Sequence, residues 1–280
     1  MAGAAGDCIG FHAEGRAPPV SIPEGEWRVS DDTLLTLATC EGILRGGGVT
    51  PEAIAAGLVD AFRRRRIPGL GASTLRALRA LDEGAHWAAA GRPGERAAGN
   101  GAAMRIAPLA LFVTGESEEE RRLVRDVCRI THKNDEAYVA ALAVIRALHL
   151  GGEPGAAAPD AIGSIARALP DTCVRDAMLS LAALGADADE AVAAEISGTS
   201  GYAVESVPLA IFLGLRWRDD AGAAIQAAVR CGGDTDTIAS IAGQIAGAAG
   251  AEIPDDWAAR IPLAADIRRL AADLASLRGE

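Results

Sequence analysis

Two short segments that lie far apart in the chain each combine two carboxylates with hydroxyl side chains. The first reads Ser30-Asp31-Asp32-Thr33, and the second reads Asp234-Thr235-Asp236-Thr237 after a pair of glycines. Each segment stands where a helix is predicted to begin, and Asp, Ser and Thr are common there because they cap free backbone N–H groups. For either segment taken alone, capping is therefore the favoured interpretation.

Taken together, the two segments indicate a metal site. Their carboxylate and hydroxyl oxygens, with no thiolate or imidazole among them, are the ligands that Mg²⁺, Mn²⁺ and Ca²⁺ prefer. If the two helix starts meet, the carboxylates repel one another strongly unless a cation lies among them. Gly232 and Gly233 would let the backbone turn tightly into such a site. The four histidines show no H-x-x-x-H spacing, which argues against zinc.

A third segment, residues 99–105 (GNGAAMR), is a glycine loop that precedes a predicted apolar helix. Its backbone N–H groups could hold a diphosphate, and an ordinary helix-start turn explains it equally well. Glu14 is a lone carboxylate in a predicted loop, and composition does not single it out. His132 lies at the end of a predicted helix, where a histidine taken alone is more often structural than functional.

Several function classes lack their signatures. The chain has no G-x-x-x-x-G-K-[ST] phosphate loop and no G-x-S-x-G nucleophile elbow, and its glycine loop follows no predicted strand. A net charge of −11 argues against nucleic acid or an anionic membrane as the main partner. The arginine run 63–66 lies at the end of a predicted helix, where cations complement the helix dipole.

The elements that must position these residues are helices. Hydrophobic residues make up 50% of the chain but aromatic residues only 4%, so the apolar content is mainly small side chains that favour helices over sheets. Periodicity and capping signals predict a helix from Ser30 to the glycines at 46–48. They also predict helices at 53–66, 118–132, 135–150, 160–169, 172–184, 187–197, 204–215, 221–230, 237–250 and 261–277.

We expect a single all-α domain spanning residues 1–280, because no linker-like tract divides the chain. Ala239, Gly243 and Gly247 recur every four residues after the second acidic segment, which predicts a tightly packed, central helix. The first ten residues lack a secretory signal, and the longest uncharged stretch, 237–251, is shorter than the roughly 18 residues of a membrane helix. Five scattered cysteines are typical of a reducing cytoplasm.

Six motifs, in the same order, resemble the ADP-ribosylglycohydrolase family. They read GDCIGFHAE, EWRVSDDT, GNGAAMRIAPLAL, THKNDEAYVAA, GYAVESVPLAIF and CGGDTDTIASIAGQIAGA, and they span most of the chain. This family includes the dinitrogenase-reductase-activating glycohydrolase and the hydrolases of ADP-ribosyl-serine and ADP-ribosyl-arginine. The resemblance implies a compact, orthogonal multi-helix bundle with a central dinuclear metal site, in agreement with the all-α composition.

The resemblance also implies roles for individual residues. Two divalent cations, Mg²⁺ or Mn²⁺, would be held by Ser30, Asp31, Asp32, Asp234, Asp236 and Thr237. Glu14 and Asp32 would be the catalytic carboxylates that manage proton transfers. The ADP-ribose would contact Gly99, Asn100, Gly101, Met104, His132 and Tyr202.

The expected activity is metal-dependent hydrolysis of the bond between ADP-ribose and an acceptor, which is a protein side chain such as Arg or Ser or a small conjugate. We expect a cytoplasmic monomer with an ADP-ribosylated substrate and no nucleic-acid or membrane partner. A catalytically silent ADP-ribose-binding relative, or a toxin-immunity protein of the same fold, is the alternative. A metal-dependent phosphohydrolase would fit the aspartates but would leave the glycine loop unexplained.

Two features depart from the family pattern. Gly6-Asp7 lies almost at the start of the chain, so the first helix is expected to be short or to begin differently. The segment from Gly15 to Trp27 is brief, so the loop that carries Glu14 is expected to close the site less completely, with consequences for the substrate range.

Overall fold

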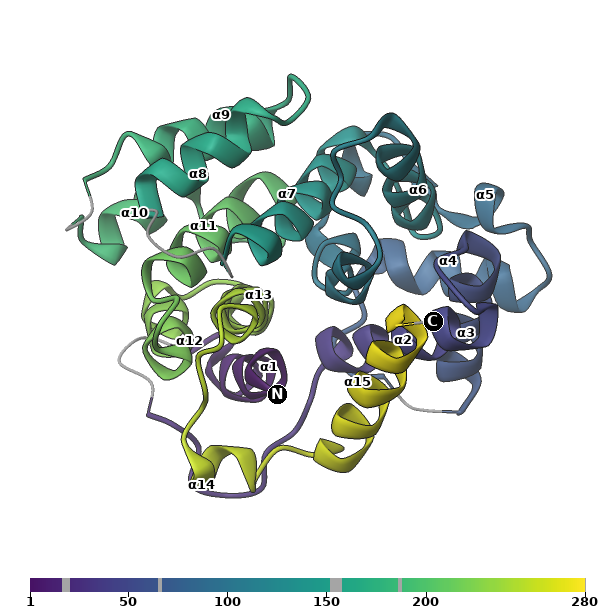
Figure 1. The fold of residues 1–280 in the computed structure, drawn as a ribbon, viewed down its shortest axis with the longest axis horizontal. Helices are drawn as coiled ribbons and strands as arrows, with labels where there is room; N and C mark the ends of the chain where they lie inside the picture. Colours follow the sequence, from purple (N-terminus) through teal and green to yellow (C-terminus); the bar gives the residue numbers. More distant parts are fainter. Residues whose placement is uncertain (17–20, 65–66, 152–157, 186–187, 280) are drawn as a thin grey trace.

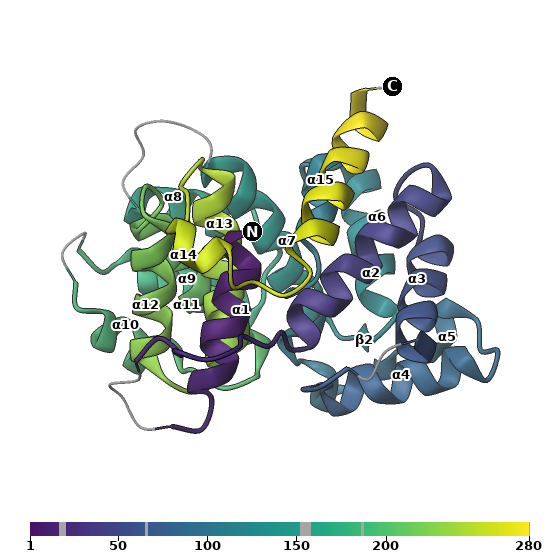
Figure 2. The same cartoon turned by 90° about the horizontal axis from the view of Figure 1, so that it is seen from below.

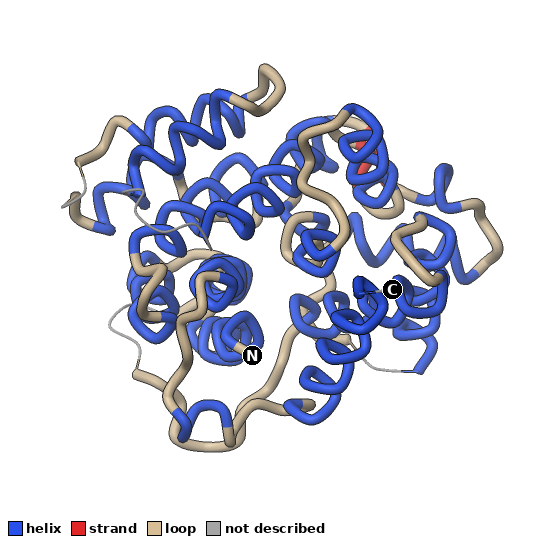
Figure 3. Tube along the Cα trace, viewed as in Figure 1, coloured by secondary structure: helices blue, strands red, loops and turns tan. Residues whose placement is uncertain are grey.

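The computed structural model describes residues 1–16, 21–64, 67–151, 158–185 and 188–279. Helices dominate this part of the chain, as Figure 3 shows, and the expected all-α multi-helix bundle is confirmed. The first half contains α1 Ala2–Ala13, α2 Asp31–Gly46, α3 Pro51–Arg64, α4 Ala72–Asp82, α5 Trp87–Ala90, β1 Arg92–Pro93, η1 Glu95–Ala97, η2 Asn100–Ala102, η3 Ala107–Leu111, α6 Glu118–Arg129 and β2 His132–Lys133. The second half contains α7 Asp135–Gly151, α8 Ala158–Arg167, α9 Cys173–Ala182, α10 Glu190–Ser197, α11 Ala203–Arg216, α12 Ala221–Cys231, α13 Thr235–Ala248, α14 Asp255–Ala258 and α15 Ala264–Gly279.

The helices cross one another at steep angles. In Figure 1, α1 and α13 are seen nearly end-on, whereas α7, α8, α9 and α11 lie across the view. Helix α7 packs against α11 and α13 and also against α6, η2 and η3. Helices α2 and α3 pack together, and α15 covers α2 (Figure 2). In this arrangement the acidic helix starts of α2 and α13 both lie beside α1.

Glycines allow α1 and α13 to approach closely. A Cβ atom at Gly6 would lie 2.1 Å from the Ala239 carbonyl oxygen, and one at Gly10 would lie 2.3 Å from that of Thr235. From the opposite helix, a Cβ at Gly243 would lie 2.6 Å from the Ala2 carbonyl oxygen. The predicted small-residue face is therefore confirmed as a close backbone-to-backbone contact, and α13 is largely buried.

Local signals explain where the helices begin and end. Ser30 caps α2, and Gly47 ends it in the left-handed conformation at φ 63°. The capping box at α6 is complete, because Ser117 accepts from the Glu120 N–H and the Glu120 side chain reaches back to the Ser117 N–H. Apart from the helix expected after the glycine loop, the bounds of the helices predicted beyond residue 50 differ from the observed ones by three residues or fewer where they fall on described residues.

The arginine run at the end of α3 is partly described. Arg63 pairs with Asp82 at 2.5 Å and Arg64 with Glu41 at 3.4 Å, and both arginine side chains are more than half exposed. Residues 65 and 66 of the predicted helix lie outside the described residues. The described arginines thus make intramolecular ion pairs on a solvated surface.

The expected apolar helix after the glycine loop is wrong. Residues 100–102 and 107–111 form short 3₁₀ turns instead. The Met104 carbonyl accepts from the side chains of Thr36 at 3.4 Å and Gln244 at 3.2 Å, so side chains take the place of a helical N–H donor. Pro108 also lacks an N–H group.

The first helix contains the Gly6-Asp7 pair at its middle. Helix α1 has 12 residues and begins at Ala2, and Glu14 caps its C-terminus with an N–H bond to the Gly10 carbonyl. Glu14 therefore follows the helix directly, and residues 17–20 farther along the expected loop lie outside the described residues. In the described part of the chain, no helix combines the length and apolar character that crossing a membrane requires.

Candidate active site

The two acidic helix starts meet, together with the C-terminal end of α1. Asp31, Asp32 and Asp236 each offer a carboxylate oxygen, and these atoms lie within 4.8 Å of one another. Glu14, Asp234 and Asp236 form a second group with the same spacing. Asp236 belongs to both groups, so two adjacent sets of three carboxylates share one residue.

A buried aspartate on α1 fixes the start of α2. Asp7, 0% exposed, accepts hydrogen bonds from the Ser30 N–H at 3.0 Å and from the Thr33 N–H at 3.1 Å. The Ser30 hydroxyl in turn accepts from the Asp32 N–H at 3.2 Å. Sequence reasoning assigned Asp7 no role, although a carboxylate between the small and apolar residues of an uncharged stretch is a signal that could have found it.

The start of α13 is attached to both other helices. The Thr235 hydroxyl donates to the Gly10 carbonyl of α1 at 2.7 Å, and the Thr237 hydroxyl donates to Asp32 at 3.2 Å. Gly232 and Gly233 adopt φ values of 71° and 77°, and a Cβ at Gly233 would lie 2.2 Å from the Thr199 carbonyl oxygen. The predicted tight turn into the site is confirmed.

The electrostatics of the cluster favour a bound cation. Burial, together with Asp236, raises the pKa of Asp31 to about 7 and that of Asp234 to about 8. Burial and the neighbouring carboxylates raise the pKa of Asp32 well above its usual range, and its Oδ1 is buried without a hydrogen-bond partner. Carboxylates that repel one another, one of them with a buried oxygen that lacks a donor, fit a site that holds divalent cations.

Glu14 is the exposed member of the cluster. Partial burial and the charge of Asp236 raise its pKa above the usual range. Because it stands at the rim, Glu14 can exchange protons with solvent or with a group that enters the site.

The glycine loop lies beside the second carboxylate group. The Asn100 amide donates to Asp234 at 2.5 Å and to the Ser206 hydroxyl at 2.9 Å, while its backbone N–H bonds the Gly201 carbonyl. Gly99 forms an isolated antiparallel bridge with Tyr202. Asn100 thus orients a carboxylate of the cluster, and Ser206 is a contributor that sequence reasoning missed.

The other expected substrate contacts differ in accessibility. The His132 ring is 3% exposed and lies against the loop, since a Cβ at Gly101 would stand 3.0 Å from its Cε1. Tyr202 is 40% exposed and lies at the rim. Met104 is 3% exposed and packs into the hydrophobic core, which leaves little of its side chain for a ligand.

A segment that sequence reasoning overlooked lies over the first carboxylate group. Gly69 has φ 86°, and a Cβ there would lie 2.6 Å from Oδ1 of Asp31. Thr74, in the first turn of the following helix, would lie 3.1 Å from a Cβ at Gly101. Two glycines before a Ser-Thr pair at a helix start are the sequence signal that could have identified this segment.

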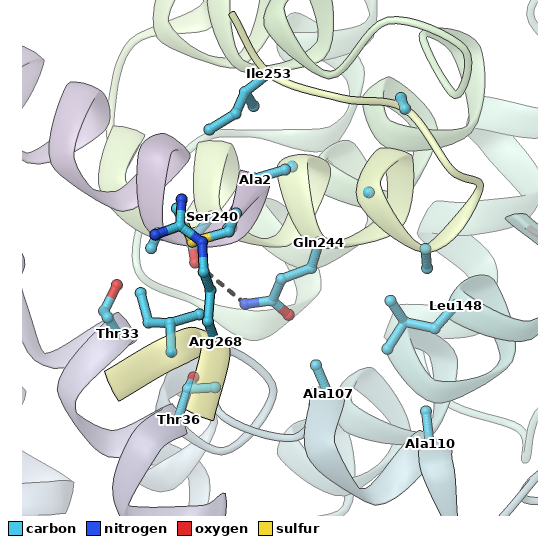
Figure 4. Close-up of a pocket in the computed structure, with 18 of the residues that line it drawn as sticks. Ala2, Thr33, Thr36, Ala107, Ala110, Leu148, Ser240, Gln244, Ile253 and Arg268 are labelled. Atoms are coloured by element: carbon cyan, nitrogen blue, oxygen red, sulfur yellow. Dashed lines mark hydrogen bonds between the residues drawn. The ribbon is translucent and has the colours of Figure 1, made fainter. Parts of the chain in front are cut away.

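A cavity of about 800 Å³ lies on another side of α2 and α13 (Figure 4). Small and aliphatic residues of α1, η3 and α13 line it, with Gln244 near its centre and Arg268 at one side. Thr33 lines the cavity, but none of the clustered carboxylates does. The cavity is therefore separate from the chemistry of the acidic cluster.

Comparisons with known proteins agree with this geometry. The whole chain, residues 1–280, matches the family model described as ADP-ribosylglycohydrolase. An uncharacterized protein of Archaeoglobus fulgidus is 29% identical, with 91% of this chain and 87% of that protein covered. The ADP-ribosylarginine hydrolase Tri1 of Pseudomonas putida is 26% identical, with 91% and 68% covered.

Similarity extends to a solved structure and to a second uncharacterized protein. The uncharacterized protein YegU of Escherichia coli is 30% identical over 78% of this chain and 70% of its own length. A structure titled ADP-ribosylglycohydrolase-related protein complex superposes with a TM-score of 0.72 at 26% identity, with 99% of this chain and 95% of that chain covered. On the full-length family match, supported by these relatives, the chain belongs to the ADP-ribosylglycohydrolase family.

Proposed function

We propose that this protein is a divalent-metal-dependent hydrolase that releases ADP-ribose from an acceptor, acting as one domain over residues 1–280. The observation that carries the proposal is the pair of carboxylate groups that share Asp236 beside a glycine loop. The acceptor would be an arginine or serine side chain or a small conjugate. Since one relative is named an ADP-ribosylarginine hydrolase, arginine-linked ADP-ribose is the first substrate to test.

The proposed cation ligands come from the two helix starts. Two Mg²⁺ or Mn²⁺ ions would be held by oxygen atoms of Ser30, Asp31, Asp32, Asp234, Asp236 and Thr237, which fit their preference for hard ligands. When bound, such cations orient ribose hydroxyls and lower the pKa of water. Asp7 and Asn100 would hold two of these ligands in position through their hydrogen bonds to Ser30 and Asp234.

The chain's own carboxylates would manage the protons. Cleavage of a glycosidic bond passes through an oxocarbenium-like transition state, and one group must accept a proton from water while another returns a proton to the leaving acceptor. Glu14 is suited to the accessible side because it is exposed and its pKa is raised. Asp32 would act on the buried side, between the Ser30 and Thr237 hydroxyls.

The glycine loop and its neighbours would bind the rest of the substrate. Backbone N–H groups of Gly99 and Gly101 would face the diphosphate, whereas that of Asn100 already donates to the Gly201 carbonyl. Asn100 would instead take part through its place in the loop. His132 lies against this loop, and the exposed Tyr202 phenol offers a surface for the adenosine or the acceptor.

A release assay tests the proposal. Protein freed of metal by a chelator is incubated with arginine-linked, serine-linked and O-acetyl ADP-ribose, with and without Mg²⁺ or Mn²⁺, and free ADP-ribose is measured. We expect metal-dependent release from at least one substrate. Asp236→Asn should reduce the rate by more than about 100-fold, since it removes the carboxylate common to both groups.

The matched control is Asp219→Asn, which changes a carboxylate that is 92% exposed and should leave the rate unchanged. Absence of metal-dependent release from all three substrates contradicts the proposal. Tight ADP-ribose binding without turnover would instead support a silent relative or an immunity protein. Hydrolysis of simple phosphate esters alone would support a phosphohydrolase.

A further inference from the structure

A cation is wholly buried behind the glycine loop. Arg105 is 0% exposed, and among the described residues no carboxylate pairs with it. Its Nη2 donates to the Val127 carbonyl at 3.2 Å and to the Thr131 hydroxyl at 3.1 Å, whereas its Nε and Nη1 have no partner. Burial lowers its pKa only to about 10, so the guanidinium stays charged at neutral pH. A buried, unpaired cation carries a desolvation cost that packing alone does not explain.

The Thr131 hydroxyl joins this cation to His132. Its oxygen lies 3.1 Å from Nη2 of Arg105 and 2.8 Å from Nδ1 of His132. A guanidinium only donates, so the hydroxyl oxygen must accept on that side and still has one hydrogen to give. In the described part of the chain the only acceptor bonded to it is Nδ1 of His132. The hydroxyl therefore donates to Nδ1, and a neutral ring then carries its proton on Nε2.

The ring is held neutral and in place. Burial, followed by the charge of Arg105, lowers the pKa of His132 to about 3. The backbone on either side is fixed, because the Arg92 N–H donates to the Thr131 carbonyl at 3.1 Å and Arg92 pairs with His132 between β1 and β2. The proton position on the imidazole is thus set from its Nδ1 edge.

The opposite edge of the ring faces the glycine loop. A Cβ at Gly99 would lie 3.4 Å from Nε2, and one at Gly101 would lie 3.0 Å from Cε1 and 3.4 Å from Nε2. Within the described residues, no protein acceptor bonds Nε2. We propose that Arg105 and Thr131 are positioning residues that hold His132 as the Nε2–H tautomer, so that it donates a hydrogen bond to an anionic oxygen of a ligand at this loop.

The ligand's identity rests on the proposed function: the oxygen would belong to the diphosphate of ADP-ribose. A neutral donor at the loop avoids placing a full charge beside the cations that the carboxylates would hold. The Arg105 charge polarises the hydroxyl and the ring behind it, which strengthens the Nε2–H donor. A bound anion would in turn supply the countercharge that Arg105 lacks.

Nuclear magnetic resonance of ¹⁵N-histidine protein tests the tautomer directly. The His132 signals are assigned by their loss in His132→Gln, and at pH 7 we expect a protonated Nε2 and an unprotonated Nδ1. Thr131→Val removes the hydroxyl, so the ring should shift toward the Nδ1–H tautomer or a mixture, with ADP-ribose binding weakened about tenfold. Thr131→Ser keeps the hydroxyl and should restore both properties.

Two further variants separate a general structural effect from the action of the relay, the hydrogen-bonded chain of Arg105, Thr131 and His132. Thr39→Val removes another fully buried hydroxyl, which among the described residues bonds only the Leu35 carbonyl on α2, and it should change neither the tautomer nor the affinity. Arg105→Met should weaken the preference for Nε2–H. If Arg105→Met does not fold, the Thr131 variants and the wild-type spectrum still decide the proposal.

The outcomes are distinct. An Nδ1–H or protonated ring in the wild type, or an unchanged tautomer in Thr131→Val, overturns the relay. Addition of ADP-ribose should shift the Nε2 resonance, and saturation without a shift overturns the hydrogen bond to the ligand. A wild-type protein that binds no ADP-ribose contradicts the proposed function and the ligand assignment, whereas the tautomer measurement still tests the positioning roles.

Discussion

At the scale of single residues, the site depends on carboxylates with different surroundings. Asp236 belongs to both groups of three, Asp32 has an oxygen without a donor, and Asp7 has its oxygens engaged by backbone N–H groups. The same residue type therefore fits two roles. A carboxylate that keeps an oxygen free of donors, as Asp32 does, fits cation binding, whereas Asp7, whose oxygens both accept from backbone N–H groups, fits a structural cap.

Asp7→Asn should uncouple α1 from α2. Asparagine has the same shape but presents an amide in place of one acceptor oxygen, so at least one bond to Ser30 or Thr33 is lost in a fully buried place. We expect a loss of about 1–3 kcal/mol in the free energy of unfolding, measured by denaturant titration. Affinity for Mn²⁺ should also fall, because Ser30 and the first turn of α2 move.

Asp219→Asn is the control for this variant, since its carboxylate is 92% exposed beside Arg218. It should change stability by less than about 0.5 kcal/mol. Equal stability of Asp7→Asn and the wild type would contradict the capping role.

His132 should make stability depend on pH. Its pKa is about 3 in the folded protein and ordinarily 6.5, so between these values the unfolded chain binds a proton that the folded protein does not. The contribution of His132 to the free energy of unfolding is fully present well above pH 6.5 and is lost as the pH falls through 6.5 toward 3. Between pH 6.5 and 5 the wild type should lose about 2 kcal/mol more than His132→Gln. Parallel stability curves for the two proteins would argue against a buried neutral ring.

At the scale of elements, α1 is the helix that joins the two acidic starts. It supplies Asp7 to α2, the Gly10 carbonyl to α13 and Glu14 to the cluster itself. Its glycines let its backbone lie directly on α13. A small change in the distance between these helices would move carboxylates on both of them.

Gly6→Ala should therefore be destabilising although alanine favours helices. The added Cβ would lie 2.1 Å from the Ala239 carbonyl oxygen, and backbone atoms cannot rotate out of the way. We expect a loss of about 1–3 kcal/mol or more in unfolding free energy. Circular dichroism on heating and metal titration would measure the loss of stability and of the site together.

Gly163→Ala in α8 is the matched helical control. There the nearest atom to a new Cβ is the end of the Arg167 side chain at 3.3 Å, which can move. Stability should be unchanged or rise by up to about 1 kcal/mol, because alanine has the higher helix propensity. Similar losses in both variants would show that the α1–α13 contact is not the cause.

At the scale of the whole molecule, folding brings buried negative charge to one place. Two groups of carboxylates meet within an already acidic chain of net charge −11, and burial and mutual repulsion raise several of their pKa values. The fold therefore stores unfavourable electrostatic energy at the site, which a divalent cation would relieve.

Mg²⁺ or Mn²⁺ should stabilise chelator-treated protein against unfolding. Because the unfolded chain does not assemble the cluster, a cation at a hundred times its Kd adds about 2.7 kcal/mol. Asp236→Asn should lose this effect, yet without cations it should unfold at a higher temperature than the wild type, since it removes charge from both groups. A thermal melt with and without metal measures both expectations.

The size of this cation effect should depend on pH. The pKa of Asp31 is about 7 and that of Asp234 about 8, so protons compete with the cation below these values. The stabilisation should be larger at pH 8 than at pH 6. A cation effect that is the same at both values, or that persists in Asp236→Asn, would contradict the assignment of these carboxylates as ligands.

Much of the fold could be predicted because its signals are local. The N-cap Ser30, the terminating glycine at 47 and the Ser117–Glu120 capping box act within one turn of their helices. The 3₁₀ turns after residue 100 could not be predicted in this way, because side chains from α2 and α13 hold the Met104 carbonyl.

The sequence by itself determined the all-α class, the two segments rich in carboxylates and hydroxyls, and the family motifs, since composition, capping and residue type can be read along the chain. Only the tertiary structure decided that Asp236 is shared by both carboxylate groups, that Asp7 caps α2 and that Asn100 bonds Asp234. The relay from Arg105 through Thr131 to His132 also depends on it. These features are distances between atoms from different elements, and such distances are fixed by helix packing rather than by spacing along the chain.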